Sequence, residues 1–316
     1  MPASVASGDR TAAAAETVIE VDGLRKHYGS EVAVVDVHMR VARGEIFGLL
    51  GPNGAGKTTT VECLQGLRRR SGGRVRVLGL DPDVDGDRLR RRTGAQLQSS
   101  ALPDRLRVGE ALALFARTGR EKENLDEIAT RWGIRDLWRR PFGTLSGGQQ
   151  KRLFIALALL NQPEIVFLDE LTTGLDPHSR RTTWDLVRRI RDEGATVVLV
   201  THFMEEAETL CDRVAIVDRG RIVATGRPDE LVDRTNSDRH VTFTWPRADL
   251  RWLSRLPGVH RVSHDGDGVE VTGTGALAVR TAAALAHRGI EPSDFRTHHP
   301  SLEDLFLELT GRDLRS

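Results

Sequence analysis

One nine-residue stretch holds the side chains and glycines needed to bind a phosphate group. It follows an apolar run, residues 46–50, that predicts a buried strand, and it precedes residues 60–64, which predict the start of a helix. A strand, a glycine-rich turn and a helix in this order form the context that a phosphate-binding loop requires. The stretch consists of Gly51, Pro52, Asn53, Gly54, Ala55, Gly56, Lys57, Thr58 and Thr59.

The residue types in this stretch suit nucleotide chemistry. Glycines let the backbone curl so that successive N–H groups point at an anion, and the helix behind them adds free donors and a positive dipole end. Lys57 can reach the β- and γ-phosphates, and the Thr58 hydroxyl can ligate Mg²⁺. Only four of the 46 basic residues are lysines, which argues against a chance match. The stretch predicts nucleotide binding and leaves open a kinase, a GTPase, a motor or a transporter ATPase.

Acidic residues and a histidine stand at the ends of two apolar runs. Residues 165–168 lead into Asp169 and Glu170, and residues 196–200 lead toward His202. Polar groups at the carboxyl ends of buried parallel strands face the ligand crevice. There Asp169 can hold Mg²⁺, Glu170 can orient or deprotonate a water, and His202 can donate to a γ-phosphate. Solvated turns and a structural histidine are the alternatives, and the upstream loop favours the functional interpretation.

A second anion site is predicted where residues 145–149 precede a helical run over 151–160. A Ser-Gly-Gly step before a long apolar helix presents free amides, as the first site does. Its members are Leu145, Ser146, Gly147, Gly148 and Gln149.

Tyr28 is the only tyrosine and lies between two strand-like runs just upstream of the phosphate-binding loop. Its ring can stack on a purine, because every base offers a π-face. A partly buried aromatic at a strand end is an equal alternative from this residue alone.

Length and composition limit the function classes. A chain of 316 residues accommodates two domains, and no apolar run approaches the length that spans a bilayer. The net charge of +1 gives no overall drive toward nucleic acid, and the arginine clusters at residues 68–70 and 88–92 are interpreted as solvated surface. Cys63 and Cys211, the only cysteines, have no disulfide or zinc spacing, which fits a reducing cytosol. Residues 1–16 lack the order of a signal peptide and are expected to form a disordered tail.

The C-terminal residues carry a pattern of their own. The expected elements are strands over 240–245, 259–263, 269–272 and 290–297 and helices over 248–256, 276–287 and 301–309. Their order, strand–helix–strand–strand–helix–strand before a final helix, predicts a ferredoxin-like module. His298 and His299 precede a proline and do not form a typical metal-ligand set, whereas Ser301 with Asp304 predicts a helix cap.

Taken together, residues 18–232 resemble the ATP-binding cassette (ABC) ATPases. The run Leu-Ser-Gly-Gly-Gln at 145–149 is nearly private to that family, and a phosphate-binding loop upstream strengthens the match. The matching motifs are the aromatic loop (Tyr28), Walker A (51–59), the Gln loop (Gln98), the signature (145–149), Walker B (165–169), the catalytic Glu170, the D-loop (Asp176) and the switch histidine (His202).

The resemblance implies a role for each matching residue. Tyr28 would stack the adenine of ATP, and Lys57 with the loop amides would hold its phosphates. Mg²⁺ would be arranged by Thr58, Gln98 and Asp169. Glu170 would be the general base, and His202 would steady the γ-phosphate. Ser146 and Gly148 would complete the site of a second copy, so hydrolysis would need a head-to-tail homodimer.

The implied fold is α/β: a P-loop ABC ATPase domain with a mixed sheet, N-terminal antiparallel strands and a helical subdomain, followed by a small α+β module. The expected division is a tail at 1–16, the ATPase domain at 17–232 with a helical insertion at about 93–145, and an accessory domain at 238–316. Two departures from the family pattern are Leu171, where proline is usual, and Arg107, where threonine is common.

The C-terminal run 300–311 and the stretch 201–208 resemble the ATPase subunits of bacterial drug-resistance exporters. That branch implies a peripheral protein on the cytoplasmic face of the cell membrane, which drives a separate multi-span permease and expels a drug or another hydrophobic compound. An importer subunit is one alternative. A soluble ABC ATPase acting on DNA or ribosomes is another, disfavoured because an ordinary helical block separates Lys57 from Ser146. No nucleic-acid partner is expected.

Overall fold

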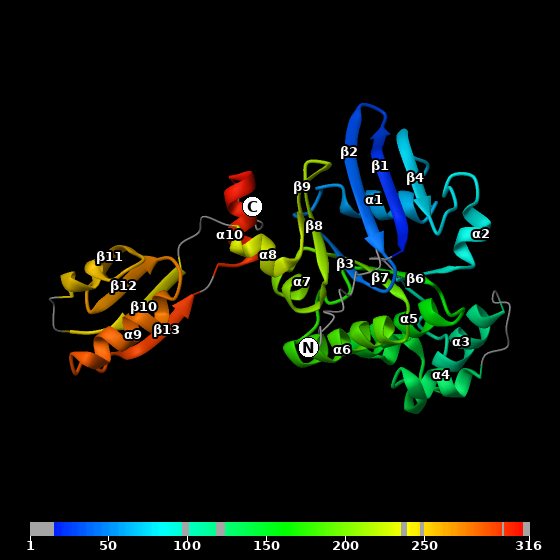
Figure 1. Cartoon of the computed structure of the whole chain (residues 1–316). Coiled ribbons are helices and arrows are strands. Elements are labelled where there is room, and N and C mark those ends of the chain that lie inside the picture. Colours follow the sequence, from blue (N-terminus) through cyan, green and yellow to red (C-terminus); the bar gives the residue numbers. More distant parts are fainter. Residues whose placement is uncertain are drawn as a thin grey trace, which may run out of the picture. The chain divides into compact units, whose positions relative to one another are not determined.

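A computed structural model describes residues 16–96, 101–117, 124–234, 239–246, 250–298 and 300–311. The expected tail, apart from its last residue, and Gln98 lie outside the described residues. Glu16 is described, and its carboxylate pairs with Arg43 at 2.7 Å. The chain divides into two compact units, Met1–Pro228 and Asp229–Ser316 (Figure 1).

The first unit is built on a nine-stranded sheet with the order β4-β1-β2-β9-β8-β3-β7-β6-β5. Antiparallel pairing joins β1 to β2 and β4, whereas β3, β5, β6, β7 and β8 pair in parallel. The predicted mixed sheet with N-terminal antiparallel strands is therefore confirmed. The strands are β1 (Thr17–Tyr28), β2 (Glu31–Ala42), β3 (Ile46–Leu50), β4 (Gly72–Val77), β5 (Thr93–Gln96), β6 (Ile165–Asp169), β7 (Thr196–Thr201), β8 (Arg213–Asp218) and β9 (Arg221–Gly226).

Three central strands, β3, β6 and β7, are buried along their whole length. Continuous burial explains why their sequences are unbroken apolar runs rather than alternating ones. Each of these strands ends at a segment that the sequence marks for chemistry. The order of the parallel strands thus brings the phosphate-binding loop, the acidic pair and the histidine to one edge of the sheet.

Helices cover this sheet and form a separate group at one end. Figure 1 shows α3 and α4 grouped beside α5, away from β1, β2 and β4. The helices are α1 (Lys57–Leu64), α2 (Gly86–Arg90), α3 (Val108–Ala116), α4 (Leu125–Arg131), α5 (Gly147–Leu159), α6 (Pro177–Asp192) and α7 (Met204–Leu210), with 3-10 turns η1 (Arg135–Leu137) and η2 (Phe142–Thr144).

The helical insertion begins later than the expected residue 93. Residues 93–96 form the edge strand β5, which pairs in parallel with β6 from Thr93 opposite Ile165 to Gln96 opposite Leu168. A Cβ atom at Gly94 would lie 2.1 Å from the Ala158 carbonyl oxygen. Because α5 approaches so closely, this position of β5 holds a glycine. The segment is short and contains glycine, so its sequence pattern does not mark it as a strand.

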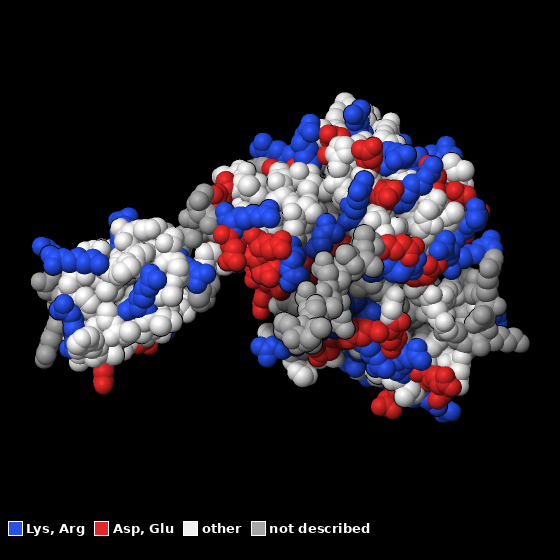
Figure 2. Space-filling model, in the orientation of Figure 1, with Lys and Arg blue, Asp and Glu red and all other residues white. Residues whose placement is uncertain are grey.

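The arginine clusters are largely paired with neighbouring carboxylates. Figure 2 shows basic and acidic side chains interspersed over the visible face of the larger unit. The pairs are Arg68 with Glu62 at 3.0 Å, Arg70 with Asp81 at 2.7 Å, Arg88 with Asp85 at 3.3 Å, Arg90 with Asp87, and Arg92 with Glu164 at 2.6 Å.

The second unit contains a four-stranded sheet with the order β11-β12-β10-β13, in which all neighbours are antiparallel. Its core includes Val241, Phe243, Val271 and Leu285. This strand order fits the ferredoxin-like interpretation, which stays a prediction. The elements are α8 (Pro228–Asp233), β10 (Arg239–Thr244), η3 (Arg251–Arg255), β11 (Val259–Asp265), β12 (Gly268–Gly273), α9 (Leu277–His287), β13 (Ser293–His298) and α10 (Leu302–Thr310).

The helix expected over 248–256 is instead the short 3-10 helix η3, with residues 247–249 outside the described residues. Leu250 and Leu253 are buried and Leu256 packs beside the same core. A spacing of three residues suits the three-residue turn of a 3-10 helix. The helix cap at α10 is confirmed, because Ser301 Oγ accepts from Asp304 N while the Asp304 carboxylate accepts from Ser301 N at 2.8 Å.

Candidate nucleotide site

The phosphate-binding loop joins β3 to α1, and two of its glycines are required by geometry. A Cβ atom at Gly51 would lie 2.2 Å from the Val217 carbonyl oxygen, and one at Gly56 would lie 2.5 Å from the Ala33 carbonyl oxygen. Gly56 also has a φ of 99°, in a region that favours glycine. The turn between β8 and β9 braces the loop from outside, because Gly220 N donates to Ala55 O at 2.9 Å.

Lys57 begins α1 with its side chain buried against the loop. Its Nζ donates to the carbonyl oxygens of Gly51 and Pro52, both at 2.8 Å. Burial lowers the pKa of Lys57, while the charges of Glu170 and Asp169 oppose that shift. The ammonium is therefore held at the loop by carbonyl oxygens, and the more strongly charged oxygens of a phosphate are better partners for it.

Asp169 ends β6 with a carboxylate that is incompletely satisfied. Its Oδ1 is buried and has no hydrogen-bond partner among the described residues. Burial raises the pKa of Asp169 to about 6, and a hydrogen bond from Thr58 opposes the shift. An unpaired buried carboxylate oxygen beside a hydroxyl matches the hard oxygen ligands that Mg²⁺ takes in phosphate sites. The residues present therefore fit a magnesium ion held by Asp169 and Thr58, with the third expected ligand, Gln98, outside the described residues.

Glu170 and His202 lie together at the ends of adjacent strands. His202 Nδ1 and Glu170 Oε1 are 3.3 Å apart, and Glu170 N donates to Val200 O at 2.9 Å. Glu170 has a φ of 47°, which is uncommon for a residue other than glycine. Such backbone strain is concentrated at functional sites, where the surrounding structure holds it. The sequence motifs at the ends of β6 and β7 thus form one carboxylate–imidazole pair.

The signature residues cap α5. Ser146 Oγ accepts from Gln149 N at 3.4 Å, and Gln149 Oε1 accepts from Ser146 N at 3.0 Å, which completes a capping box. Leu145 is buried, whereas Ser146 and Gly147 are exposed. The start of this helix is therefore anchored from within and presents Ser146 to solvent.

Asp176 caps α6 next to the signature. Its carboxylate accepts from the backbone N–H groups of His178 and Ser179 at 3.0 Å, and the Ser179 hydroxyl donates to it at 2.6 Å. These hydrogen bonds lower the pKa of Asp176, that from the Ser179 hydroxyl most of all. A Cβ atom at Gly148 would lie 3.2 Å from Ser179 Oγ. The signature and the D-loop therefore form one continuous surface.

Tyr28 is the last residue of β1 and its side chain is 39% exposed. Lys26 Nζ lies 4.7 Å from the ring centroid. The ring therefore does not belong to the core, which removes one argument for a purely structural role. The remaining loop residues keep their expected places, with Thr58 and Thr59 in the first turn of α1.

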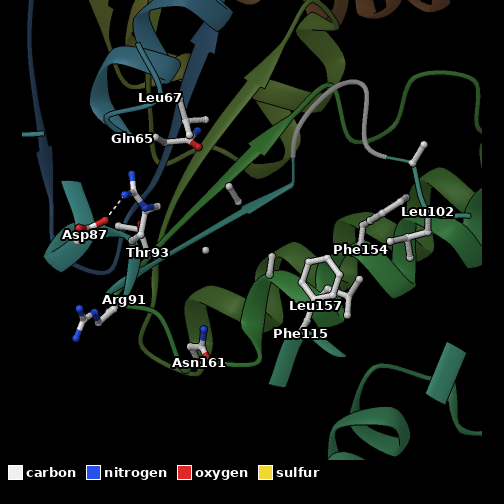
Figure 3. Close-up of a pocket in the computed structure, with 15 residues that line it drawn as sticks. Gln65, Leu67, Asp87, Arg91, Thr93, Leu102, Phe115, Phe154, Leu157 and Asn161 are labelled. Atoms are coloured by element: carbon white, nitrogen blue, oxygen red, sulfur yellow. Dashed lines mark hydrogen bonds and ion pairs between the residues drawn. The ribbon is translucent and has the colours of Figure 1, made fainter. Parts of the chain in front are cut away.

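A groove that the sequence did not reveal opens between described residues of the first unit. Its volume is about 720 Å³, and Ala95 and Ala101 are among the residues that line it. Figure 3 shows Leu102, Phe115, Phe154 and Leu157 gathered on one side, with Gln65, Leu67 and Asp87 across from them. An apolar floor with a polar rim is the make-up of a binding groove. The sequence pattern does not mark the groove, because Phe115 of α3 is identified as exposed only in the structure.

The fold and this site define a P-loop ATPase. Residues 34–173 match the ABC transporter family. The chain is 39% identical to the daunorubicin resistance ATP-binding protein DrrA3 of Streptomyces coeruleorubidus over 95% of this chain and 98% of that protein. It is 35% identical to the Nod factor export ATP-binding protein I of Ralstonia nicotianae over 94% of this chain and 95% of that protein.

The chain is also similar to a solved structure of an ATP-binding subunit of an ABC transporter, with a TM-score of 0.62 and 26% identity. The match covers 69% of this chain and 93% of that subunit. The chain belongs to the ABC transporter family. It is an ATP-binding subunit of a transporter, and it hydrolyses ATP. No helix among the described residues is long and apolar enough to cross a membrane.

Proposed function

We propose that the chain is the ATP-hydrolysing subunit of an exporter that works as a homodimer with two composite sites. The observation that carries the proposal is the surface formed by the signature and the D-loop. The exposed Ser146 and the start of α5 pack beside Ser179 of α6 through Gly148. A helix start with free amides is an anion site. In a head-to-tail dimer it faces the γ-phosphate that Lys57 of the other copy holds.

Within each composite site the residues of this chain divide the work. Lys57 and the loop amides bind the phosphates, and Asp169 with Thr58 holds Mg²⁺, which supplies charge neutralisation at the phosphates when bound. Glu170 accepts a proton from the attacking water, since its carboxylate lies at the same sheet edge. His202, fixed by Glu170 at 3.3 Å, donates to the γ-phosphate.

The groove of about 720 Å³ supports a separate membrane permease as the partner. Its apolar side chains, Leu102, Phe115, Phe154 and Leu157, suit the apolar face of a short helix from the permease. The chain would then sit on the cytoplasmic face of the membrane without spanning it. Export rather than import is supported by relatives named for drug resistance and for Nod factor export, which match almost the full chain.

Substitution of the general base tests the dimer. Glu170→Gln should keep ATP binding and lower kcat by roughly 10²- to 10⁴-fold, the range for a lost general base. Because ATP then stays in place, size-exclusion chromatography with light scattering should show a dimer with Mg-ATP and a monomer without it. Adding Ser146→Arg to this variant should abolish the dimer. Hydrolysis by Glu170→Gln at the parent rate, or a trapped species that stays monomeric, would contradict the proposal.

Co-expression tests the transporter partner and the direction of transport. The full chain should co-purify with a multi-span permease from a neighbouring gene, and Phe115→Asp, which places a charge in the groove, should weaken that association. Cells that hold both proteins should accumulate less of a fluorescent anthracycline than cells with the Glu170→Gln variant. Recovery of DNA or ribosomes with the chain would instead favour the soluble alternative, and faster uptake would favour an importer.

A further inference from the structure

A buried polar cluster lies behind the carboxylate–imidazole pair. Glu206 of α7 is 1% exposed, and Thr172, Trp184 and Thr201 are buried around it. The other two glutamates of this helix, Glu205 and Glu208, are exposed. A favourable interaction with the helix dipole is enough to explain the two exposed glutamates. It does not explain why the Glu206 carboxyl group is buried, because burial of a polar group costs free energy.

The contacts of Glu206 reach three different segments. Trp184 Nε1 of α6 donates to Glu206 Oε1 at 3.1 Å. Thr201, at the end of β7, and Thr172, after β6, place their hydroxyls beside the same carboxyl group. Thr201 Oγ1 in turn accepts from Phe203 N at 3.0 Å. One side chain therefore contacts α6 and the segments that follow β6 and β7.

The hydrogen bonding of this cluster is incomplete. Among the described residues, Glu206 Oε2, Thr172 Oγ1 and Arg180 Nε are buried without a partner of good hydrogen-bond geometry. A buried polar atom without a hydrogen-bond partner is energetically unfavourable. Thr172 lies beside Glu206, and the charge of Arg180 acts on the same carboxyl group, so the polar atoms of α6, α7 and the segment after β6 depend on one another.

These three segments carry catalytic groups. Thr201 precedes His202, Thr172 follows Glu170 by two residues, and α6 is capped by Asp176 of the D-loop. A second contact runs in parallel: the Arg180 guanidinium lies 5.1 Å from the Phe203 ring centroid, and that ring lies 4.1 Å from the ring of His202. Movement of α6 therefore reaches His202 through packed side chains.

We propose that Glu206 is a positioning residue for ATP hydrolysis: by joining Trp184 of α6 to the segment of Thr201, it holds His202 in place and transmits the position of the D-loop to it. The proposal rests on the role assigned to His202 above. Burial raises the pKa of Glu206, while the hydroxyls of Thr201 and Thr172, the Trp184 N–H and the charge of Arg180 oppose the shift. Glutamine has nearly the same shape as glutamate and keeps an oxygen that can accept from Trp184 Nε1.

The test measures hydrolysis by the full-length chain with Mg-ATP, in steady state and in single turnover so that slow variants are quantified. Glu206→Ala should lower kcat about tenfold and leave KM within about twofold, because the residue touches no nucleotide. Glu206→Gln should retain at least about a third of the rate. Glu208→Gln is the matched control, since its side chain on the same helix is exposed, and it should hydrolyse ATP as the parent does.

A double-variant cycle with His202 separates positioning from a general loss of stability. If Glu206 acts through His202, then adding Glu206→Ala to His202→Ala should slow hydrolysis by less than about twofold. The proposal would be overturned if the rate losses of the two single variants multiply in the double variant. It would also be overturned if a folded Glu206→Ala protein hydrolyses ATP at the parent rate. If Glu206→Ala does not fold, Trp184→Phe removes the same hydrogen bond with little loss of packing, and it should show the same cycle. A His202→Ala protein at the parent rate would refute the role of His202 itself.

Discussion

At the scale of single residues, the candidate site is a set of buried polar groups whose partners in the free protein are incomplete. Lys57 is held by two carbonyl oxygens, and Asp169 has one oxygen without a partner among the described residues. Burial without full compensation costs free energy. A ligand that carries both phosphate and a divalent cation gives these groups partners, so its binding recovers part of that cost.

Asp169 makes the stability of the nucleotide-free protein depend on pH. Its pKa rises from 3.8 to about 6 in the fold, so the folded protein retains a proton that the unfolded chain has released between these values. The stabilisation is complete below about pH 4 and is lost as the pH rises through about 6. Between about pH 5 and about pH 8, the Tm of the parent should fall by a few degrees more than that of Asp169→Asn. If fluorimetry shows that the Tm values of the two proteins change with pH in parallel, the prediction is contradicted. Bound Mg-ATP should remove the difference in pH dependence between the two proteins.

Tyr28 offers a test of base stacking that is independent of the phosphates. Tyr28→Ala should raise the Kd for ATP roughly tenfold, because stacking of a base on an aromatic ring contributes about 1 to 3 kcal/mol. Tyr28→Trp should bind as the parent does. Inorganic tripolyphosphate, which has no base, serves as the control in calorimetry, and its affinity should not change. An equal loss of affinity for both ligands would place Tyr28 in the support of the loop rather than at the adenine.

At the scale of elements, the sequence predicts best where one physical cause dominates. The apolar runs of β3, β6 and β7 identify strands because those strands are buried on both faces. The cap of α10 is local and was found from Ser301 and Asp304 alone. By contrast, β5 is a strand because of its pairing with β6, and Glu206 is buried because α6 packs over it. Such contacts between distant segments leave no periodic trace in the local sequence.

The turn between β3 and α1 allows the steric need for glycine to be separated from backbone strain. Gly54 and Gly56 both have positive φ values, 79° and 99°, but only a Cβ atom at Gly56 would meet a neighbour, the Ala33 carbonyl oxygen at 2.5 Å. Gly56→Ala should therefore weaken ATP binding at least about tenfold and lower the Tm further than Gly54→Ala, which adds strain without a clash. Calorimetry and thermal unfolding of both variants measure this. Equal losses would show that the contact with Ala33 does not matter.

At the scale of the whole molecule, the nucleotide-binding residues belong to the first unit and the C-terminal module to the second. The residues proposed to bind ATP and Mg²⁺ all precede Pro228, and the large core of the first unit includes Phe47, Leu49 and Phe167. The module has its own sheet and its own core around Phe243 and Leu253. The family match covers only part of the first unit, yet DrrA3 of Streptomyces coeruleorubidus aligns over 95% of the chain. The sequence similarity to this relative therefore extends through residues of the C-terminal module.

A fragment that ends at Pro228 tests whether the first unit is independent. Because its core and its nucleotide-binding residues are its own, we expect the fragment to unfold in one cooperative transition and to bind Mg-ATP with a Kd within about threefold of the full chain. Scanning calorimetry and titration calorimetry measure the two properties. Lys57→Ala in the fragment is the control and should abolish binding. A fragment that aggregates, or that binds ATP only when residues 229–316 are restored, would show that the module completes the fold of the ATPase unit.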